Sequence, residues 1–415
     1  MSNDATPPVA GWRTDDPLTL VPGFRAAGVA AGIKKHGGLD LALIVADTPC
    51  AAAAVFTTNQ VQAPPVQFDR ALLQRNAAGL RAVVINSGCA NAVTGAEGLH
   101  NTALTAQAVS EALRLPSDSV FVMSTGVIGQ QLPMERILPG IQQAVQQLAT
   151  DDAAGHAAAH AIMTTDTRPK EVTLRTTIAG LPVTLAGICK GAGMIHPNMA
   201  TLLALVCTDA VIDPPTLDAA LHYAVERSFN CMTIDGDTST NDTLLALASG
   251  TAGHAPLTAP DTSAFVQFRD ALTTVCVELA KLVARDGEGA TKFVTIEVTG
   301  ARSFADARSI GRTIATSSLV KTALFGTDAN WGRVLAAVGR SAVAVEPSLL
   351  ALWFSDIQLV DAGAPLAYAE ADAHAALTGA DVRLRVDLGL GQHAATVWTC
   401  DFSHEYVSIN ADYRT

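Results

Sequence analysis

Short apolar runs bounded by turn residues are the feature that most constrains how this chain folds. Stretches with helical periodicity lie between and after them, at residues 100–114, 135–149, 214–227 and 262–284. Because buried strands need cover on both faces, this order predicts a mixed α/β (α+β) chain with sheets covered by helices. Three of the runs have the length and composition of buried strands: LDLALIVAD (39–47), RAVVINSG (81–88) and SVFVMSTG (119–126).

The rest of the chain shows two further patterns, an alternation of residue types at 171–191 and shorter segments after about residue 290. Residues 171–191 alternate on both sides of Ala179-Gly180, which predicts a β-hairpin. From about residue 290 the segments become shorter, which indicates a smaller C-terminal α/β part over about 290–400. Its expected elements are a strand at 293–300, a helix at 304–324, a helix after Asn330, and strands near 382–389 and 394–401.

The composition restricts the class of protein. Of 415 residues, 49% are apolar and 16% are charged, which supplies large cores for two or three domains. The net charge of −12, without a long basic run, argues against a nucleic-acid partner. The seven cysteines are widely spaced and form no C-x-x-C pair, so we expect no disulfide framework. With no signal-like start and no apolar stretch of about 18 residues, we expect a cytoplasmic protein without a membrane partner.

Two motif-like features lack an essential part. Lys190 precedes its neighbouring glycines, whereas the lysine of a phosphate-binding P-loop follows them, so this is not a P-loop. His156 and His160 would share one face of a helix, but no third ligand is visible nearby. We interpret them as two exposed histidines on an alanine-rich helix and expect no metal site.

The segment KGAGMIHPNMATLLALVCTDA, residues 190–210, joins a glycine-rich loop to a buried strand. A threonine at the lip of such a strand, here Thr201, is most often an ordinary β-branched strand residue. The sequence around Thr201 supports a second interpretation. The small side chain of Ala200 does not shield the Ala200 carbonyl, and Pro197 restricts the backbone. A hydroxyl held against a strained peptide can attack that carbonyl and cut the chain. The new α-amino group, with a pKa of about 7.7–8.0, can then act as base for the hydroxyl.

Residues 190–201, KGAGMIHPNMAT, closely resemble the self-cleavage signature of the ArgJ family of glutamate N-acetyltransferases, also called ornithine acetyltransferases. The resemblance runs along the whole chain in the family's order, so the chain is identified as a member. The further motifs are NSGCANAVTG (86–95), STGVIGQQLPMERI (124–137), MTTDTRPK (163–170), NCMTIDGDTSTND (230–242), DGEGATKF (286–293), TALFGTDANWGR (322–333) and YVSINADYRT (406–415).

The resemblance implies a fold and a division of the chain. The fold is an ArgJ/DmpA-like sandwich of β-sheets covered by helices, in a self-cleaving N-terminal-nucleophile enzyme. Cleavage between Ala200 and Thr201 would give an α fragment, 1–200, and a β fragment, 201–415. The α fragment would hold the oxyanion hole and the Lys190 loop, and the β fragment would begin with the nucleophile strand. The family suggests an assembly of two α and two β fragments.

The resemblance also implies the reaction. Acetyl passes from N-acetyl-L-ornithine to L-glutamate by a ping-pong mechanism through an acetyl-threonine ester, within cyclic arginine biosynthesis. No cofactor is implied. The family offers two alternatives for the donor, since some members use N-acetylornithine alone and others also accept acetyl-CoA as a co-substrate. The sequence favours neither alternative.

The site residues follow from the family's motifs. Thr201 is the implied nucleophile, and Thr125 and Gly126 form the implied oxyanion hole. Lys190 supplies a cation for a carboxylate and Glu288 can receive an ammonium group. The implied substrate-binding positions are Thr164, Lys190, Thr201, Glu288, Asn410 and Thr415.

Two other functions stay open. A self-processing aminopeptidase or amidohydrolase could use the same nucleophile and pass its acyl group to water. A binding protein whose junction stays intact is the non-enzymatic alternative. His196, just before the junction, could influence cleavage, but we expect a partly exposed spectator.

Overall fold

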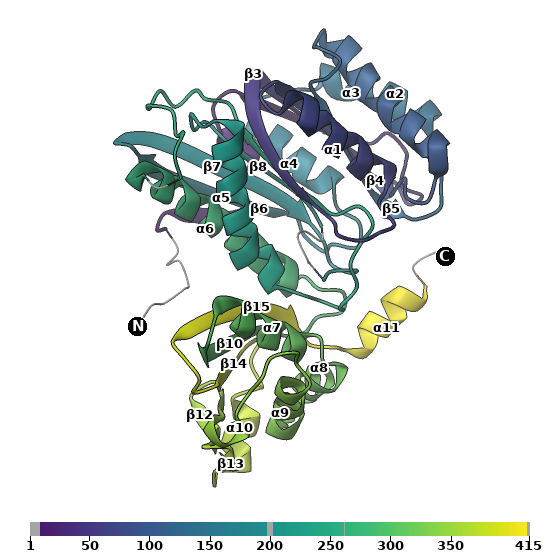
Figure 1. Ribbon diagram of the computed structural model, residues 1–415. Coiled ribbons are helices and arrows are strands. Elements are labelled where there is room, and N and C mark those ends of the chain that lie inside the picture. Colours follow the sequence, from purple (N-terminus) through teal and green to yellow (C-terminus); the bar gives the residue numbers. More distant parts are fainter. Residues whose placement is uncertain (1–8, 197–201, 261, 413–415) are drawn as a thin grey trace.

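Two β-sheets organise this computed structural model, which describes residues 9–196, 202–260 and 262–412 (Figure 1). A nine-stranded sheet forms one half of the molecule, and a six-stranded sheet near the C-terminus forms the other. Helices pack against both sheets, so the predicted mixed α/β class is confirmed. One hydrophobic core runs from the larger sheet through α5 and α6 to the smaller sheet.

The larger sheet has the strand order β1-β6-β7-β8-β9-β3-β4-β5, and β2 pairs with β3. The predicted hairpin is confirmed as β6 and β7, joined at Ala179 and Gly180, which both have positive φ. The strands are β1 (Trp12–Thr14), β2 (Phe24–Val29), β3 (Leu41–Phe56), β4 (Leu80–Cys89), β5 (Val120–Val127), β6 (Lys170–Ile178), β7 (Leu181–Lys190), β8 (Leu203–Thr208) and β9 (Thr243–Ala248).

The larger sheet folds back on itself as a sandwich, because β3 changes partners along its length. Its first part pairs with β2 and β4, and its second part, Ala51–Phe56, pairs with β9. Alternate residues of β8 then face different cores. Leu203 and Leu205 pack in a core shared with β3, β4 and β5, whereas Ala204 and Val206 pack against α5 and α6.

Helices form the outer layers of this sandwich. α2 and α3 pack on the β2–β5 side, and α5 and α6 pack on the β6–β9 side (Figure 1). The helices of this half are α1 (Pro64–Asn76), α2 (Gly95–Leu113), α3 (Met134–Gln146), α4 (Asp152–Ala161), α5 (Pro214–Arg227) and α6 (Ser263–Arg285), with short 3-10 turns at Leu18–Leu20 and Phe229–Cys231.

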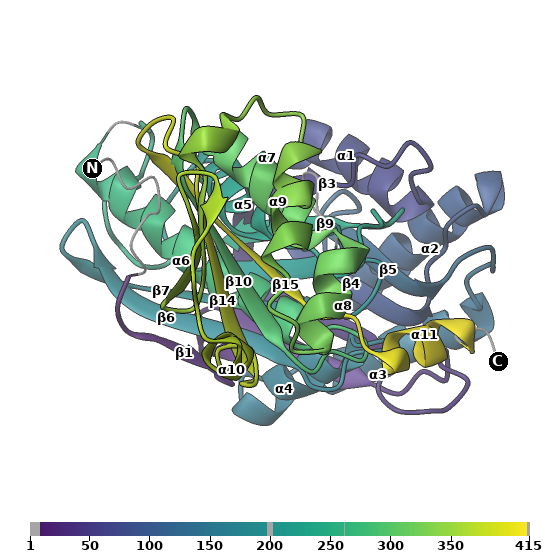
Figure 2. The same ribbon diagram turned by 90° about the horizontal axis from the view of Figure 1, so that it is seen from below.

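The smaller sheet has the order β13-β12-β11-β14-β10-β15. Figure 2 shows α7, α8 and α9 gathered along it. Its strands are β10 (Phe293–Ala301), β11 (Ala351–Phe354), β12 (Ile357–Asp361), β13 (Ala364–Pro365), β14 (Asp381–Asp387) and β15 (His393–Cys400). The helices of this half are α7 (Phe304–Ala315), α8 (Ser318–Phe325), α9 (Trp331–Gly339), α10 (Glu370–Ala375) and α11 (His404–Ala411), with a 3-10 turn at Pro347–Leu349.

The single helix predicted over 304–324 is wrong. The chain forms α7 and α8, with a break at Thr316 and Ser317. The Ser317 hydroxyl accepts a hydrogen bond from the backbone N–H of Val320 at 3.4 Å and so begins a new helix. The apolar periodicity continues across the break, which is why the pattern indicated one helix.

Two further features are the state of the cysteine side chains and the apolar character of the helices. All seven cysteines are buried with free thiols. Within the described ranges, none of the helices combines the length and the apolar character that crossing a bilayer requires.

Candidate active site

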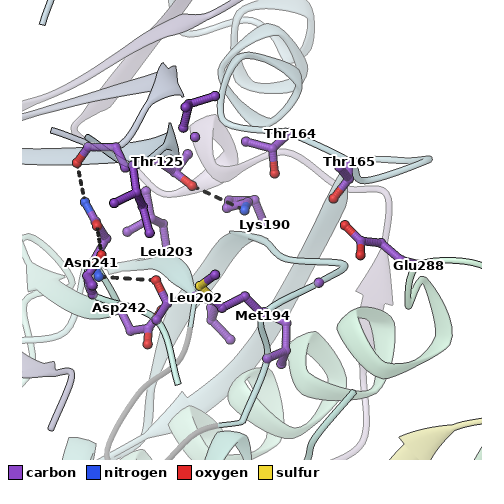
Figure 3. A pocket seen from close by; sticks show the side chains of 18 of the residues that line it. Thr125, Thr164, Thr165, Lys190, Met194, Leu202, Leu203, Asn241, Asp242 and Glu288 are labelled. Atoms are coloured by element: carbon purple, nitrogen blue, oxygen red, sulfur yellow. Dashed lines mark hydrogen bonds between the residues drawn. The ribbon is translucent and has the colours of Figure 1, made fainter. Parts of the chain in front are cut away.

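A cavity of about 370 Å³ lies where the ends of β5 and β7 meet the start of β8 (Figure 3). Residues from motifs far apart in the sequence line it. Six of the predicted site residues are among them: Thr125, Gly126, Thr164, Lys190, Glu288 and Asn410. Ala200, Thr201 and Thr415 lie outside the described residues.

The backbone at the end of β5 is built around two glycines. Gly126 has φ +130° and is the register partner of Gly88 on β4. A Cβ atom at position 126 would lie 2.3 Å from the carbonyl carbon of Gly88, so only glycine fits. Thr125 precedes it and is 8% exposed at the wall of the cavity.

Lys190 ends β7 and brings a buried cation to the cavity. Its Nζ donates a hydrogen bond to the Thr125 hydroxyl at 3.3 Å, and both side chains lie together in Figure 3. Burial lowers the pKa of the Lys190 ammonium, and the nearby Asp166 carboxylate offsets part of this effect. Lys190 therefore has spare donors beside the β5 backbone, in a place where a carboxylate or a developing oxyanion can be received.

A buried acid–base cluster missed by the sequence analysis positions this wall. Lys170 is fully buried, and its Nζ lies 2.6 Å from both Asp166 Oδ1 and Asp286 Oδ2. Asp166 also accepts the backbone N–H groups of Gly191 at 2.6 Å and Thr164 at 2.9 Å. Burial by itself raises the pKa of Asp166, but Lys170 and Lys190 outweigh it and lower that pKa to about 2. The available signal was the Asp166–Lys170 spacing of four residues.

Glu288 and Asn410 form the opposite wall. Asn410, on α11, donates a hydrogen bond through Nδ2 to Glu288 Oε2 at 2.8 Å. Gly193 makes room for this carboxylate, since a Cβ atom there would lie 2.3 Å from Glu288 Oε2. The C-terminal helix therefore reaches the cavity, as the predicted roles of the last residues require.

Two paired strands, β7 and β8, flank the predicted cleavage site in the sequence. The chain leaves β7 at Lys190 and re-enters the sheet at Leu203, which is its register partner on β8. Ile195 and Leu202, near the two sides of residues 197–201, both line the cavity. The described chain therefore meets the cavity on each side of the predicted cleavage site.

The motif at 230–242 and the start of β9 hold both sides of this junction. Asp235 accepts the backbone N–H groups of Met194 at 2.5 Å and Ile195 at 2.8 Å. On the other side, the N–H of Thr243 donates to the carbonyl of Leu202 at 2.8 Å. These bonds fix the described ends of the junction, a role that the sequence analysis did not assign.

His196 is partly exposed, as expected, and it is held between two partners. Its Nε2 lies 2.6 Å from Arg312 and its Nδ1 lies 3.0 Å from the Thr233 hydroxyl. Because Arg312 can only donate, Nε2 accepts and Nδ1 carries the proton. Burial, with a smaller contribution from Arg312, lowers the pKa of His196 to about 4. The histidine is therefore neutral near pH 7.

Asp242 is a further residue that the sequence analysis missed. It lines the cavity, and its Oδ2 is buried without a hydrogen-bond partner in the described chain. Burial raises its pKa well above the usual value. Asn241 beside it donates to the carbonyls of Ala90 at 2.6 Å and Ser124 at 2.9 Å, which ties this floor to β5.

The two histidines of α4 differ from the expectation of two exposed side chains. His156 is half-buried, and its Nδ1 lies 2.7 Å from Glu171, whereas His160 is exposed. Among residues 9–196, 202–260 and 262–412, no group of three or more His, Cys, Asp or Glu side chains is arranged to hold a metal ion.

Comparison with known proteins gives consistent matches. The ArgJ family model matches residues 25–415. The arginine biosynthesis bifunctional protein ArgJ of Symbiobacterium thermophilum is 48% identical over 400 residues, covering 96% of this chain and 98% of that protein. Its counterpart from Geobacter sulfurreducens is 50% identical over 400 residues, covering 95% of this chain and 100% of that protein. The crystal structure of a Mycobacterium tuberculosis ornithine acetyltransferase in complex with ornithine is 46% identical, covers 46% of this chain and all of that chain, and gives a TM-score of 0.43.

Proposed function

The chain belongs to the ArgJ family, an acyltransferase family of arginine biosynthesis, and from this premise we propose that it transfers acetyl from N-acetyl-L-ornithine to L-glutamate. One observation carries the proposal. Thr125, Gly126, Lys190 and Glu288, which come from three separate motifs, line one cavity that the chain on both sides of residues 197–201 also lines. No cofactor is needed, and the proposed compartment is the cytoplasm.

The catalyst forms by cleavage between Ala200 and Thr201. The Thr201 hydroxyl attacks the carbonyl of Ala200, and hydrolysis of the resulting ester releases an α fragment, 1–200, and a β fragment, 201–415. The new α-amino group of Thr201, with a pKa near about 7.7–8.0 before perturbation, takes the proton of its own hydroxyl. We propose that the fragments assemble as α2β2.

Acetyl transfer then proceeds in two steps. The Thr201 oxygen bonds to the acetyl carbon of N-acetylornithine, the carbon–nitrogen bond breaks, and ornithine leaves with the proton. The amino group of glutamate attacks the ester, and N-acetylglutamate leaves while the hydroxyl is restored. Each step passes through an oxyanion, for which the Gly126 backbone N–H and the Thr125 hydroxyl are the proposed donors. One such donor is worth roughly 2.7–4 kcal/mol in the transition state.

Charge complementarity supports amino-acid substrates. Lys190 offers a buried ammonium to a substrate carboxylate. Glu288, oriented by Asn410, offers a carboxylate to the substrate's ammonium. Thr164 lies on the wall between them, on a loop held by Asp166. Thr415 is the remaining proposed contact, and Asn410 on α11 lines the same cavity.

The reaction is tested by following labelled acetyl. Purified protein is incubated with N-acetylornithine labelled in its acetyl group, together with unlabelled glutamate. Labelled N-acetylglutamate is the expected product. Labelled acetate as the only product would instead identify the alternative hydrolase.

The nucleophile is tested with Thr201→Ala. This variant is expected to stay a single full-length chain on denaturing electrophoresis and to lose activity by more than about a thousandfold. Thr201→Ser is the matched control, because it retains a hydroxyl and is expected to cleave. A Thr201→Ala protein that still gives two half-size bands would eliminate Thr201 as the cutting residue, and an uncut wild-type chain would favour the binding-protein alternative.

A further inference from the structure

A cavity of about 540 Å³ lies between α6 and the strands β10 and β15, and we call it the α6 cavity. None of the described residues that line it also lines the candidate active site. Of its lining, only Cys231 and Phe293 belong to the motifs found in the sequence. Its volume lies in the range of cavities that bind small molecules, yet the proposed acetyl transfer gives it no role.

Arg227, at the C-terminal end of α5, lines this cavity with unmet hydrogen-bonding capacity. Its guanidinium carbon lies over two rings, 3.7 Å from the centroid of Tyr223 and 4.8 Å from that of Phe304. Its Nε is buried without a hydrogen-bond partner among the described residues, and none of their carboxylates forms an ion pair with it. Stacked rings do not replace the in-plane hydrogen bonds of a guanidinium. Because buried donors in folded proteins are nearly always satisfied, Arg227 calls for a partner from outside the described chain.

The two other cations of the cavity lining already have acidic partners. Lys281 Nζ lies 2.8 Å from a carboxylate oxygen of Glu278, and a guanidinium nitrogen of Arg285 lies 2.5 Å from Asp381. Arg227 is therefore the cation that the described lining leaves unpaired. Its planar fork of N–H donors suits a carboxylate, which can accept two parallel hydrogen bonds.

Aromatic side chains form much of the remaining wall. Trp12, Phe293, Phe304 and Trp398 line the cavity, although aromatic residues make up only 5% of the chain. Two of the four tryptophans thus meet at one cavity. Trp398 is the register partner of Thr295, two residues from Phe293 along β10, so both rings lie on the same face of the smaller sheet. Such a wall offers flat apolar surface to a ligand that carries a ring.

Cations of α6 hold two of these rings in place. Lys281 Nζ lies 5.7 Å from the ring centroid of Trp398, and the guanidinium carbon of Arg285 lies 4.4 Å from that of Phe293. The acidic partners of both cations fix their positions in turn. The aromatic wall is therefore formed before any ligand arrives, which lowers the cost of binding.

We infer that the α6 cavity binds an aromatic monocarboxylate, with its carboxylate at Arg227 and its ring against the aromatic wall. One unpaired cation matches one negative charge, whereas a diphosphate or triphosphate would bring several charges without partners. A small inorganic anion would leave the rings unused. The inference is independent of the proposed acetyl transfer, because the two cavities have no described lining residue in common.

Isothermal titration with indole-3-acetate tests the site, and indole-3-acetamide is the matched neutral ligand. Wild-type protein is expected to bind the carboxylate about tenfold more tightly than the amide, because only the carboxylate forms a charge-assisted pair with Arg227. Arg227→Leu is expected to bind both ligands with the same Kd. Arg227→Lys keeps the charge without the planar fork and is expected to restore part of the preference.

Arg269→Leu is the matched control variant. Arg269 also lies over Tyr223, at 4.0 Å, but it is ion-paired with Asp270 and is not among the residues that line the cavity. This variant loses a stacked guanidinium without losing the proposed contact, so both Kd values are expected to stay within about twofold of wild type. A thermal unfolding midpoint close to that of wild type shows that Arg227→Leu is folded, and Arg227→Lys takes its place if it is not.

The aromatic wall is tested separately with Trp12→Ala. Loss of one stacked ring is expected to raise Kd for indole-3-acetate by about fivefold. Trp353→Ala removes a tryptophan that does not line the cavity, and its Kd is expected to stay within about twofold of wild type. Equal effects of the two variants would contradict the proposed place of the ring.

Three results would overturn the inference: wild-type protein that does not bind indole-3-acetate, Arg227→Leu protein that keeps the tenfold preference, or equal effects of Arg227→Leu and Arg269→Leu. Turnover of N-acetylornithine by Arg227→Leu is expected to stay within about twofold of wild type. Failure of the proposed function is a separate result, because it appears in the wild-type acetyl assay, to which no indole ligand is added.

Discussion

Asp166 is the residue on which the geometry of the candidate active site depends most directly. One carboxylate binds the Lys170 ammonium and also accepts the backbone N–H groups of Gly191 and Thr164. It therefore joins β6, the loop after β7 and the loop before β6. Its low pKa shows that the folded protein favours the charged form.

Asp166→Asn is expected to destabilise the protein by about 3–5 kcal/mol, because it leaves Lys170 buried with only one carboxylate. Denaturant unfolding of the two proteins measures this difference. Asp47→Asn is the matched control, since Asp47 forms an exposed ion pair with Arg25, and it is expected to cost less than about 1 kcal/mol. Equal losses for the two variants would contradict the buried role of Asp166.

The same carboxylate predicts a pH effect. Because the pKa of Asp166 falls from 3.8 to about 2 on folding, its contribution to stability is present above about pH 4. That contribution is lost as the pH falls from about 4 toward 2, since the unfolded state then takes up the proton while the folded state still holds the carboxylate charged. Unfolding measured across this range is expected to show a smaller acid dependence in Asp166→Asn than in wild type. Parallel curves would show that other groups govern acid unfolding.

Gly126 predicts a catalytic effect at one backbone position. In Gly126→Ala the new Cβ meets the Gly88 carbonyl, so the backbone N–H must move away from the reacting carbonyl. We expect kcat to fall by about 10²–10³. Gly129→Ala is the control, because Gly129 also has positive φ but has open space around its Cβ position. If both variants lose the same activity, backbone strain rather than the proposed donor explains the loss.

At the scale of elements, α11 is the segment that links the C-terminal end of the chain to the cavity. It projects away from the six-stranded sheet in Figure 1, and Asn410 on it reaches Glu288. Gly289 permits its close approach, since a Cβ atom there would lie 2.5 Å from the backbone nitrogen of Tyr406.

Gly289→Ala is therefore expected to push α11 away and separate Asn410 from Glu288. KM for N-acetylornithine should rise about tenfold, as expected when a hydrogen bond to a charged group is lost. Asn410→Ala should give a similar rise. Gly180→Ala, at a turn with positive φ and open space, is the control and should leave KM unchanged. A normal KM in Gly289→Ala would show that α11 does not contribute to binding.

Elements with strong local signals were predictable from the sequence. The β6–β7 hairpin has its Ala-Gly turn, and α5 has Asp213 as N-cap before two prolines. The second half of β3 was not predictable from the sequence, because Ala51–Ala54 has low strand propensity and becomes a strand only by pairing with β9. The predicted strand at 39–47 therefore stops well before the end of β3 at Phe56.

The site was predictable to the extent that its residues lie in motifs. The structure gathers six of those residues at one cavity, while their roles stay predictions. Asp242 and the Asp166–Lys170–Asp286 cluster depend on tertiary burial, which periodicity does not show.

At the scale of the whole molecule, the two proposed fragments are interleaved in one sheet. β8 and β9 follow the proposed cleavage site in sequence, yet they lie between β7 and β3, which precede it. Backbone hydrogen bonds of β7–β8 and β3–β9 cross the boundary on both sides. Cleavage removes one peptide bond and none of these ladders.

The cleaved protein is therefore expected to behave as one particle. In gel filtration under native conditions, both fragments should elute together, and at the same volume as uncut Thr201→Ala. They should separate only in denaturant, because separation exposes the cores on both faces of β8 and β9. Fragments that elute apart in native buffer would contradict this arrangement.

This interleaving also has a genetic consequence. Consider a cell that makes two inactive variants, one altered before the cleavage site and the other altered after it. An unaltered α fragment and an unaltered β fragment are then both present in the cell. Each of them, however, already shares a β-sheet with an altered fragment. Activity could return only if the two molecules exchanged fragments, and this exchange would require both molecules to unfold. The two variants are therefore expected not to complement each other. In a complementation test, the two fragments would therefore behave as a single genetic unit.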